Sequence, residues 1–257
     1  MSDSSIPQRR LFLHPPHGTV GVSAGAAAIQ ARGAQPDLAD GLSAGFLRLC
    51  LAGPANSGAD AALLALEDCL AENCPGALCR HLRISGPKRF TAQELGQFDG
   101  LVWIAPPAAM ADGLQPSLWA WCAEGGGVAI LGAWPTPHQR RADEAGQMPP
   151  PPAARPISVF PYSQGHRLVA GVRPFNARVI AGELLPCPHE PLLGDAVPLL
   201  IAAEPGRSEP VAWARPYGRG RLVYTSLGHP ADFRQGGFGR FLANAATWIT
   251  SAARCDP

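Results

Sequence analysis

The stretch that decides the fold covers residues 210–248 and reads PVAWARPYGRGRLVYTSLGHPADFRQGGFGRFLANAATW. Residues 211–217 and 222–227 are rich in β-branched and aromatic side chains, and Gly218-Arg219-Gly220 supplies a turn between them. This pattern predicts two strands joined by a tight turn. Apolar residues then recur at helical spacing and predict a closing helix. They are Phe238, Phe241, Leu242, Ala245, Trp248 and Ile249.

The segment Ser226-Leu227-Gly228-His229-Pro230 leads out of the second strand toward the closing helix. Pro230 disfavours helical geometry at His229, so the imidazole is expected on a loop at the carboxyl end of the strand. Ligands of open α/β sheets bind at that edge. His229 is therefore a candidate acid or base near neutral pH. The alternative is a histidine that only bonds backbone groups of its own loop.

This stretch resembles the C-terminal signature of the ThuA-like (trehalose-utilisation) proteins, a branch of the class I glutamine-amidotransferase-like superfamily. The matching positions are 210–217, 218–221, 224–225, 227–229, 232–233 and Trp248. The run FDGLVWIAP at 98–106 resembles the family as well, as does the strand after Gly125-Gly126-Gly127. The resemblance implies a flavodoxin-like or class I glutamine-amidotransferase-like three-layer sandwich with a mostly parallel sheet, and a role in sugar or keto-sugar metabolism.

The rest of the chain independently predicts an α/β domain. Apolar strands are predicted at 46–52, 78–84, 101–105, 128–131 and 197–203, and helices at 59–73 and 116–123. Thr91-Ala92-Gln93-Glu94 has the pattern of a capping box and predicts the start of a short helix. Strands that alternate with helices favour a doubly wound sheet.

Two segments are predicted to lie outside regular structure. Residues 1–44 are rich in Pro, Gly and Ala without periodic spacing, which predicts a disordered extension before an α/β domain over 45–252. Residues 135–165 include five prolines between positions 149 and 156 and are predicted to form a long surface loop of that domain.

Composition excludes several classes of function. A net charge of +1 with 16% charged residues argues against nucleic-acid binding. No apolar run is long enough for a membrane span or a signal peptide, so a cytoplasmic location is expected. The seven cysteines form no CxxC pair, which indicates neither a zinc knuckle nor a redox motif.

The chain lacks the nucleophile typical of this superfamily. A Cys or Ser nucleophile would lie on a strand–helix elbow, but residues 104–107 and 131–134 hold neither residue. ThuA-like proteins usually carry further histidines after the first strand and after the strand that follows the three glycines. Residues 53–56 and 131–133 hold no histidine. A metal site normally needs about three protein ligands, so no metal and no cofactor are predicted.

The sequence predicts a site at the carboxyl edge of the sheet. The predicted catalytic residues are His229 and Asp232, and the predicted ligand-binding residues are Asn56, Trp134, Glu183 and Ser226. Trp134 could offer a stacking surface for a sugar or only a lid over the core. Asp232 could equally cap a turn, and Glu183, at a position that resembles a family motif, could be a solvated strand-end carboxylate.

Two functions stay open at this point. The first is a carbohydrate-acting hydrolase, lyase or isomerase without a Cys or Ser nucleophile, with His229 as its acid/base. The second is a non-catalytic member of the fold that binds a small ligand or a partner protein. The expected partner is a small molecule, with a sugar as the first candidate, and the sequence leaves homo-oligomer formation open.

Overall fold

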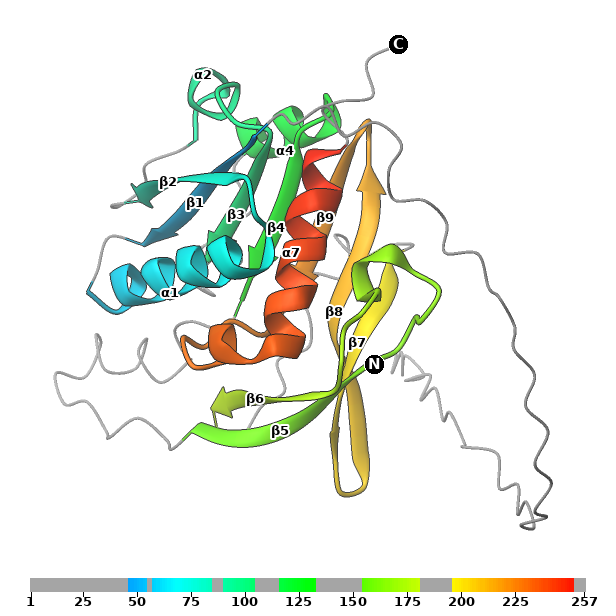
Figure 1. Cartoon of the computed structure of the whole chain (residues 1–257). Helices are drawn as coiled ribbons and strands as arrows, with labels where there is room; N and C mark the ends of the chain where they lie inside the picture. The colour runs from blue at the N-terminus through cyan, green and yellow to red at the C-terminus, as the bar shows by residue number, and fades with distance from the viewer. Residues whose placement is uncertain are drawn as a thin grey trace, which may run out of the picture. The chain divides into compact units, whose positions relative to one another are not determined.

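The computed structural model describes residues 46–54, 57–84, 90–104, 116–132, 154–180 and 196–251. Within these residues nine strands form a single sheet, and helices cover both of its faces (Figure 1). The strands are β1 (Leu47–Pro54), β2 (Ala77–Ile84), β3 (Gly100–Ile104), β4 (Gly127–Leu131), β5 (Ala154–Pro161), β6 (Phe175–Ile180), β7 (Val197–Glu204), β8 (Arg207–Tyr217) and β9 (Gly220–Thr225). The helices are α1 (Ser57–Asn73), α2 (Ala92–Leu95), α4 (Pro116–Ala123) and α7 (Gly236–Thr250), with short 3-10 turns η1 (Arg167–Val169) and η2 (Asp232–Arg234).

The sheet changes character half-way across. Its order is β2-β1-β3-β4-β9-β8-β7-β5-β6. The strands from β2 to β9 pair in parallel, and those from β9 to β6 pair antiparallel. The predicted α/β class is confirmed. The prediction of a mostly parallel sheet is corrected, because it missed two of the antiparallel strands, β5 and β6.

Part of the predicted Pro-rich loop is the strand β5. Ile157 and Val159 are buried and alternate with exposed residues, which is the pattern of a strand with one face in the core. Pro156 pairs only with β6 and Pro161 only with β7. Each proline therefore lies where β5 has a neighbour on one side, and its missing N–H is tolerated there. The prolines concealed this alternation in the sequence.

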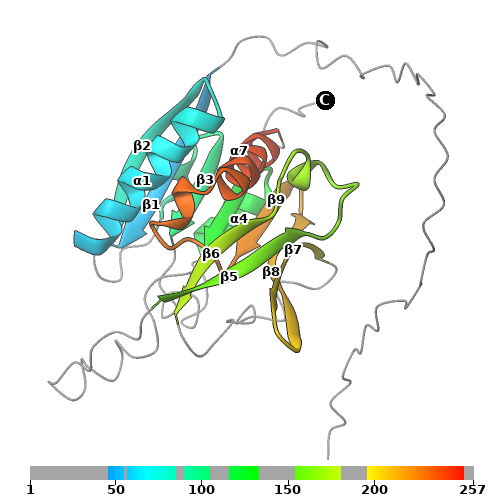
Figure 2. The same ribbon diagram turned by 60° about the horizontal axis from the view of Figure 1, so that its bottom comes forward.

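Side chains of the parallel strands alternate between two apolar layers. In β3, Val102 and Ile104 belong to the cluster that includes α1 and α7, whereas Leu101 and Trp103 belong to the cluster that includes α2 and α4. Figure 2 shows α1 and α7 on one side of the sheet. A strand covered on both faces must be apolar at every position, and all five residues of β3 are buried.

Two glycines allow helices to approach the sheet closely. A Cβ at Gly127 would lie 2.1 Å from the carbonyl oxygen of Ile249 in α7, and one at Gly220 would lie 2.0 Å from that of Cys122 in α4. No real side chain tolerates such distances from backbone atoms, so glycine is required where β4 and β9 begin.

Several local predictions are confirmed. The helix α4 has the predicted bounds of 116–123. The Oγ1 of Thr91 accepts a hydrogen bond of 3.1 Å from the N–H of Glu94, and the Glu94 carboxylate accepts one of 3.0 Å from the N–H of Thr91, which is the predicted capping box. The turn between β8 and β9 contains Gly218 at a φ of +59°, a conformation that favours glycine.

The predicted extension over residues 1–44 lies outside the described residues, as do residues 135–153 of the predicted loop. Among the helices that are described, none is both long and apolar enough to cross a membrane.

Candidate functional site

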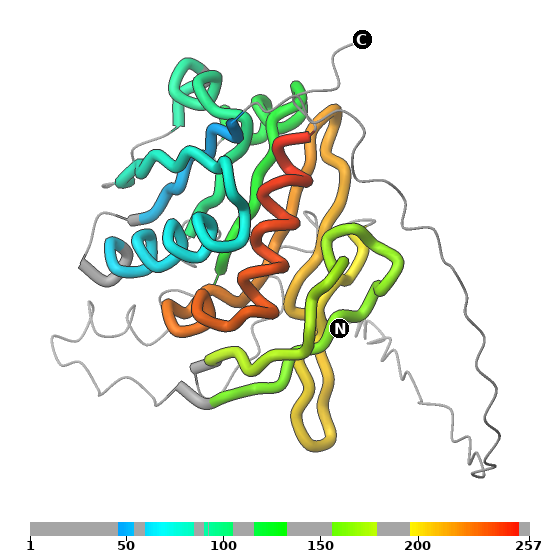
Figure 3. The backbone as a smooth tube through the Cα atoms, in the orientation of Figure 1, coloured from blue at the N-terminus to red at the C-terminus, as the bar shows by residue number. Residues whose placement is uncertain are grey.

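The candidate site is the loop after β9, at the edge where the parallel strands end. Because β1, β3, β4 and β9 run in the same direction, their carboxyl ends share one edge. The chain leaves β9 at Thr225, passes through residues 226–231 into η2, and enters α7 (Figure 3). The turn η2 contacts α1, α7 and β6. The loop therefore lies where ligands of α/β sheets usually bind.

Thr225 and Ser226 fasten the start of the loop to β8. The buried Oγ1 of Thr225 donates a hydrogen bond of 2.8 Å to the carbonyl of Val211 and accepts one of 3.1 Å from the N–H of Leu227. The N–H of Ser226 donates to the same carbonyl at 3.0 Å. Gly228 follows at a φ of +141°, which favours glycine. The loop therefore leaves the sheet along a fixed path.

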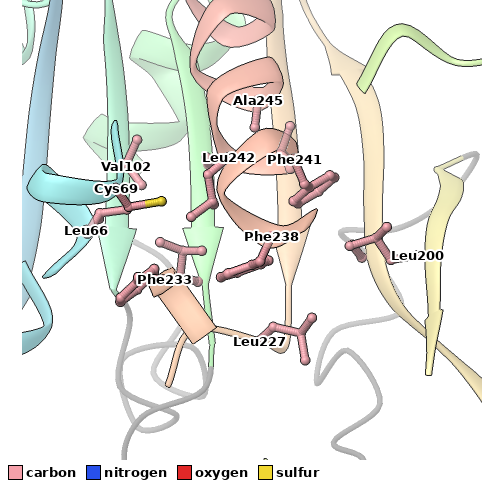
Figure 4. Close-up of a cluster of buried hydrophobic side chains, with 14 of the residues drawn as sticks. Leu66, Cys69, Val102, Leu200, Leu227, Phe233, Phe238, Phe241, Leu242 and Ala245 are labelled. Carbon is pink, nitrogen blue, oxygen red and sulfur yellow. The ribbon is translucent and has the colours of Figure 1, made fainter. Parts of the chain in front are cut away.

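Two buried apolar side chains anchor the loop to the hydrophobic core. Leu227 and Phe233 are 1% and 4% exposed and belong to the core cluster beneath α7. Figure 4 shows Phe233 beside Phe238 of α7, and their ring centroids are 5.9 Å apart in a stacked arrangement. His229 thus lies between two buried anchors.

His229 is half-buried, and its orientation is set by its own loop. Its Nδ1 accepts a hydrogen bond of 3.1 Å from the N–H of Ala231, and its carbonyl accepts one of 2.7 Å from the N–H of Asp232. Burial, and then the charge of Arg178, lower the pKa of His229 below its ordinary value. The imidazole is therefore neutral at pH 7, and since Nδ1 accepts a hydrogen bond, the ring carries its proton on Nε2.

Asp232, the other predicted catalytic residue, is 0% exposed and does not face solvent. Its Oδ1 accepts a hydrogen bond of 2.6 Å from the backbone N–H of Arg178 in β6. Its Oδ2 is buried without a hydrogen-bond partner among the described residues. The predicted capping role also differs, since Ala231 holds the N-cap position of η2 and makes no side-chain cap bond.

The electrostatics of Asp232 follow from this burial. Burial raises the pKa of its carboxyl group from 3.8 to about 6. The backbone N–H groups of Arg178, Gly228 and His229 and the charge of Arg178 oppose that rise in pKa. The carboxyl group therefore titrates close to neutral pH while it connects the loop to β6.

The remaining predicted residues have different outcomes. Ser226 is half-buried at the start of the loop. Asn56, Trp134 and Glu183 lie outside the described residues, so their place in the site stays a prediction.

Arg178 is the residue that sequence reasoning missed. It is exposed in β6, and its backbone and its charge both reach the candidate site. The alternation of buried Phe175 and Ala177 with exposed Asn176 and Arg178 was the available signal for this strand.

Other reactive groups of the described residues lie elsewhere. Nε2 of His81 lies 3.0 Å from a carboxylate oxygen of Glu67, and His166 packs edge-on against Trp248 with ring centroids 6.0 Å apart. Burial raises the pKa of Cys50 and of Cys122 to about 12, which keeps both as unreactive thiols. In the part of the chain that the structure describes, no group of three or more His, Cys, Asp or Glu side chains is placed to hold a metal ion.

Comparison with known proteins identifies the fold. A ThuA-like protein of Parabacteroides merdae superposes with a TM-score of 0.57 at 16% identity, over 80% of this chain and 90% of the other. A ThuA-like protein of Bacteroides uniformis superposes with a TM-score of 0.53 at 13% identity, over 82% of this chain and 94% of the other. The predicted ThuA-like fold is confirmed, and at such identities the likeness extends to the fold alone. No protein-family model matches the sequence, and no curated protein matches it.

Proposed function

We propose that the loop after β9 binds a small carbohydrate and that His229 acts on it as a hydrogen-bond donor. The single observation that carries the proposal is the hydrogen bond of 3.1 Å from the N–H of Ala231 to Nδ1 of His229. This bond fixes the ring of a neutral histidine at the carboxyl edge of the sheet, and it leaves the ring proton on Nε2.

The tautomer of His229 decides whether the side chain donates a hydrogen bond to the ligand or acts as a base. A neutral imidazole with its proton on Nε2 donates a hydrogen bond to a carbonyl or hydroxyl oxygen, and it has no lone pair on Nε2 with which to act as a base. A neutral histidine that donates in this way stabilises negative charge on an oxygen during the isomerisation or cleavage of a sugar. The proposed reaction class is therefore a carbohydrate-acting isomerase, lyase or hydrolase.

In this proposal Asp232 is a positioning residue. Its carboxyl group is buried and cannot contact a ligand directly. It holds β6 through the N–H of Arg178 and lies near the N–H groups of Gly228 and His229. Its role is to keep the loop in the conformation that presents the imidazole.

The order β2-β1-β3-β4-β9 supports a flavodoxin-like assignment for the parallel half, since the 2-1-3-4-5 order is that of flavodoxin-like sheets. The class I glutamine-amidotransferase-like assignment is part of the same proposal. The absence of a Cys or Ser at the two strand ends, 104–107 and 131–134, supports chemistry without such a nucleophile.

The second candidate function is binding without catalysis. Residues 53–56 and 131–133 lack the histidines that ThuA-like proteins usually carry, and Asp232 is withdrawn from the surface. Of the residues predicted to be catalytic, His229 is then the one that remains partly exposed. A single fixed donor is sufficient for ligand binding.

A panel of neutral sugars, keto-sugars and sugar acids, with thermal shift and titration calorimetry as readouts, tests the site. The informative variant is His229→Asn, because an Asn oxygen can still accept the N–H two residues ahead. His166→Asn is the matched control, since Nδ1 of His166 accepts the equivalent bond of 3.2 Å from the N–H of Leu168.

We expect a sugar to stabilise the wild type and the His166 variant but not the His229 variant. NMR of the incubated sugar then separates the two functions: a new product supports the enzyme, and unchanged sugar supports the binding module. Equal binding by wild type and His229→Asn would contradict both.

A further inference from the structure

The second feature of the site is its charge, which comes from β6 and from the loop itself. The loop over residues 226–235 and the strand β6 together contain three charged residues, Arg178, Asp232 and Arg234. Asp232 is fully buried, whereas Arg178 and Arg234 are exposed. The charge that this part of the protein presents to solvent is therefore entirely positive.

The backbone of Arg178 is fixed relative to His229. Its N–H donates the bond of 2.6 Å to Oδ1 of Asp232, and Asp232 lies three residues after His229 in the same loop. Because β6 is the last strand of the sheet, this bond also occupies a backbone donor at the sheet's edge. A strand far from the loop in sequence thus has its backbone fixed to the loop that contains His229.

The positive charge of Arg178 influences the pKa values of both His229 and Asp232. The charge of Arg178 contributes to lowering the pKa of His229 and opposes the rise in the pKa of Asp232. Arg178 has further interactions within the chain. What qualifies it for ligand recognition is its charge and exposure, and not an unused donor.

We infer that the ligand of this site carries a negative group, a carboxylate or a phosphate, and that Arg178 recognises it while His229 donates to a neighbouring oxygen. The inference rests on the proposed function and narrows its carbohydrate to a sugar acid or a sugar phosphate. A guanidinium matches both anions with two parallel N–H donors, which an ammonium group does not.

The test uses three probes with one sugar ring: glucose, glucuronate and glucose 6-phosphate. We expect at least one of the anionic probes to bind the full-length wild type tenfold or more tightly than glucose, and the better anion identifies the group. Arg178→Gln should remove that advantage, so that the anionic probe binds no more tightly than glucose. Arg178→Lys should retain part of it, since charge is kept and the planar fork is lost. Arg240→Gln, an exposed arginine of α7, is the control and should keep the full advantage.

The outcomes separate this inference from the proposed function. Equal binding of all three probes, abolished by His229→Asn, would overturn the inference and leave the proposed function intact. Tight anion binding that survives Arg178→Gln would overturn the role of Arg178. No binding of any probe would contradict both proposals. Thermal melting of each variant checks folding, which the side-chain change should preserve because Asp232 bonds the backbone of Arg178 and not its side chain.

Discussion

The backbone N–H of Arg178 donates a hydrogen bond of 2.6 Å to Oδ1 of Asp232, and this bond joins β6 to the His229 loop across 54 residues of sequence. A buried carboxyl group thus connects the last strand of the sheet to the candidate site. Removing the carboxyl group of Asp232 should therefore disturb both β6 and the His229 loop.

Asp232→Ala should lower the free energy of unfolding by about 1–3 kcal/mol, because the N–H of Arg178 loses its acceptor in a buried environment. Urea denaturation at pH 5, where the carboxyl group is mostly neutral, measures this effect. Asp68→Ala removes an exposed carboxylate of α1 and should stay within about 0.5 kcal/mol of the wild type. Equal stability of the two variants would show that the bond contributes nothing.

The free energy of unfolding should fall as the pH rises through 6. The folded chain holds the Asp232 proton more tightly than the unfolded chain, because burial raises the pKa from 3.8 to about 6. The stabilising contribution is complete below pH 3.8 and is lost as the pH rises through the folded value. A shift of this size corresponds to about 3 kcal/mol.

Asp232→Asn isolates the contribution of the Asp232 carboxyl group to the pH dependence of stability, because asparagine does not titrate. The charged neighbour that influences the pKa of Asp232 is Arg178, whereas His229 influences it through its backbone N–H. The lowered pKa of His229 acts in the opposite direction, but both proteins contain it, so it cancels in the difference. Urea denaturation from pH 4 to pH 8 should show the variant gaining stability relative to the wild type. A difference that does not change with pH would refute the assignment.

Gly220→Ala should destabilise the fold by at least about 3 kcal/mol or prevent folding, because the added Cβ would lie 2.0 Å and 2.1 Å from the carbonyl oxygens of Cys122 and Gly126. Gly165→Ala is the matched control, since a Cβ there meets no atom within 4 Å. Its stability should stay within about 0.5 kcal/mol of the wild type. Thermal melting of both variants measures the contrast, and similar melting temperatures would contradict the close approach of α4 to β9.

Removal of metal ions should leave the melting temperature and any sugar response unchanged. The described residues contain no group of three or more metal-ligating side chains, and tight sites normally need about that number. Elemental analysis of the purified protein and melting after dialysis against EDTA measure this. Stoichiometric zinc or manganese would overturn the prediction.

Local patterns in the sequence predicted the local structure well. The capping box of Thr91 and Glu94, the helix α4 and the apolar strand β3 each depend on neighbouring residues, and each is present. The alternation in β5 was readable in the same way, but the prolines around it favoured a loop. The antiparallel half was missed in part for that reason.

The candidate site was only partly predictable, because its key contact is not local. Pro230 and the strand before it placed His229 on the loop at the carboxyl edge. Nothing in the sequence near Asp232 indicates that its carboxyl group meets a backbone N–H in β6, since that depends on the path of the whole antiparallel half. The burial of Asp232 and the contribution of Arg178 therefore required the structure.

The pairing of β4 with β9 has a consequence for how the chain reaches its folded state. β4 ends at Leu131, but the strand that completes its pairing begins only at Gly220, and the helix that covers both ends at Thr250. At a translation rate of about 5–20 residues per second, an apolar strand waits on the order of ten seconds for its neighbour to be synthesised. During that time its edge can pair with other chains. The nascent protein is thus most vulnerable to aggregation in the interval before β9 and α7 emerge, and chaperones that bind exposed apolar strands should act on it then.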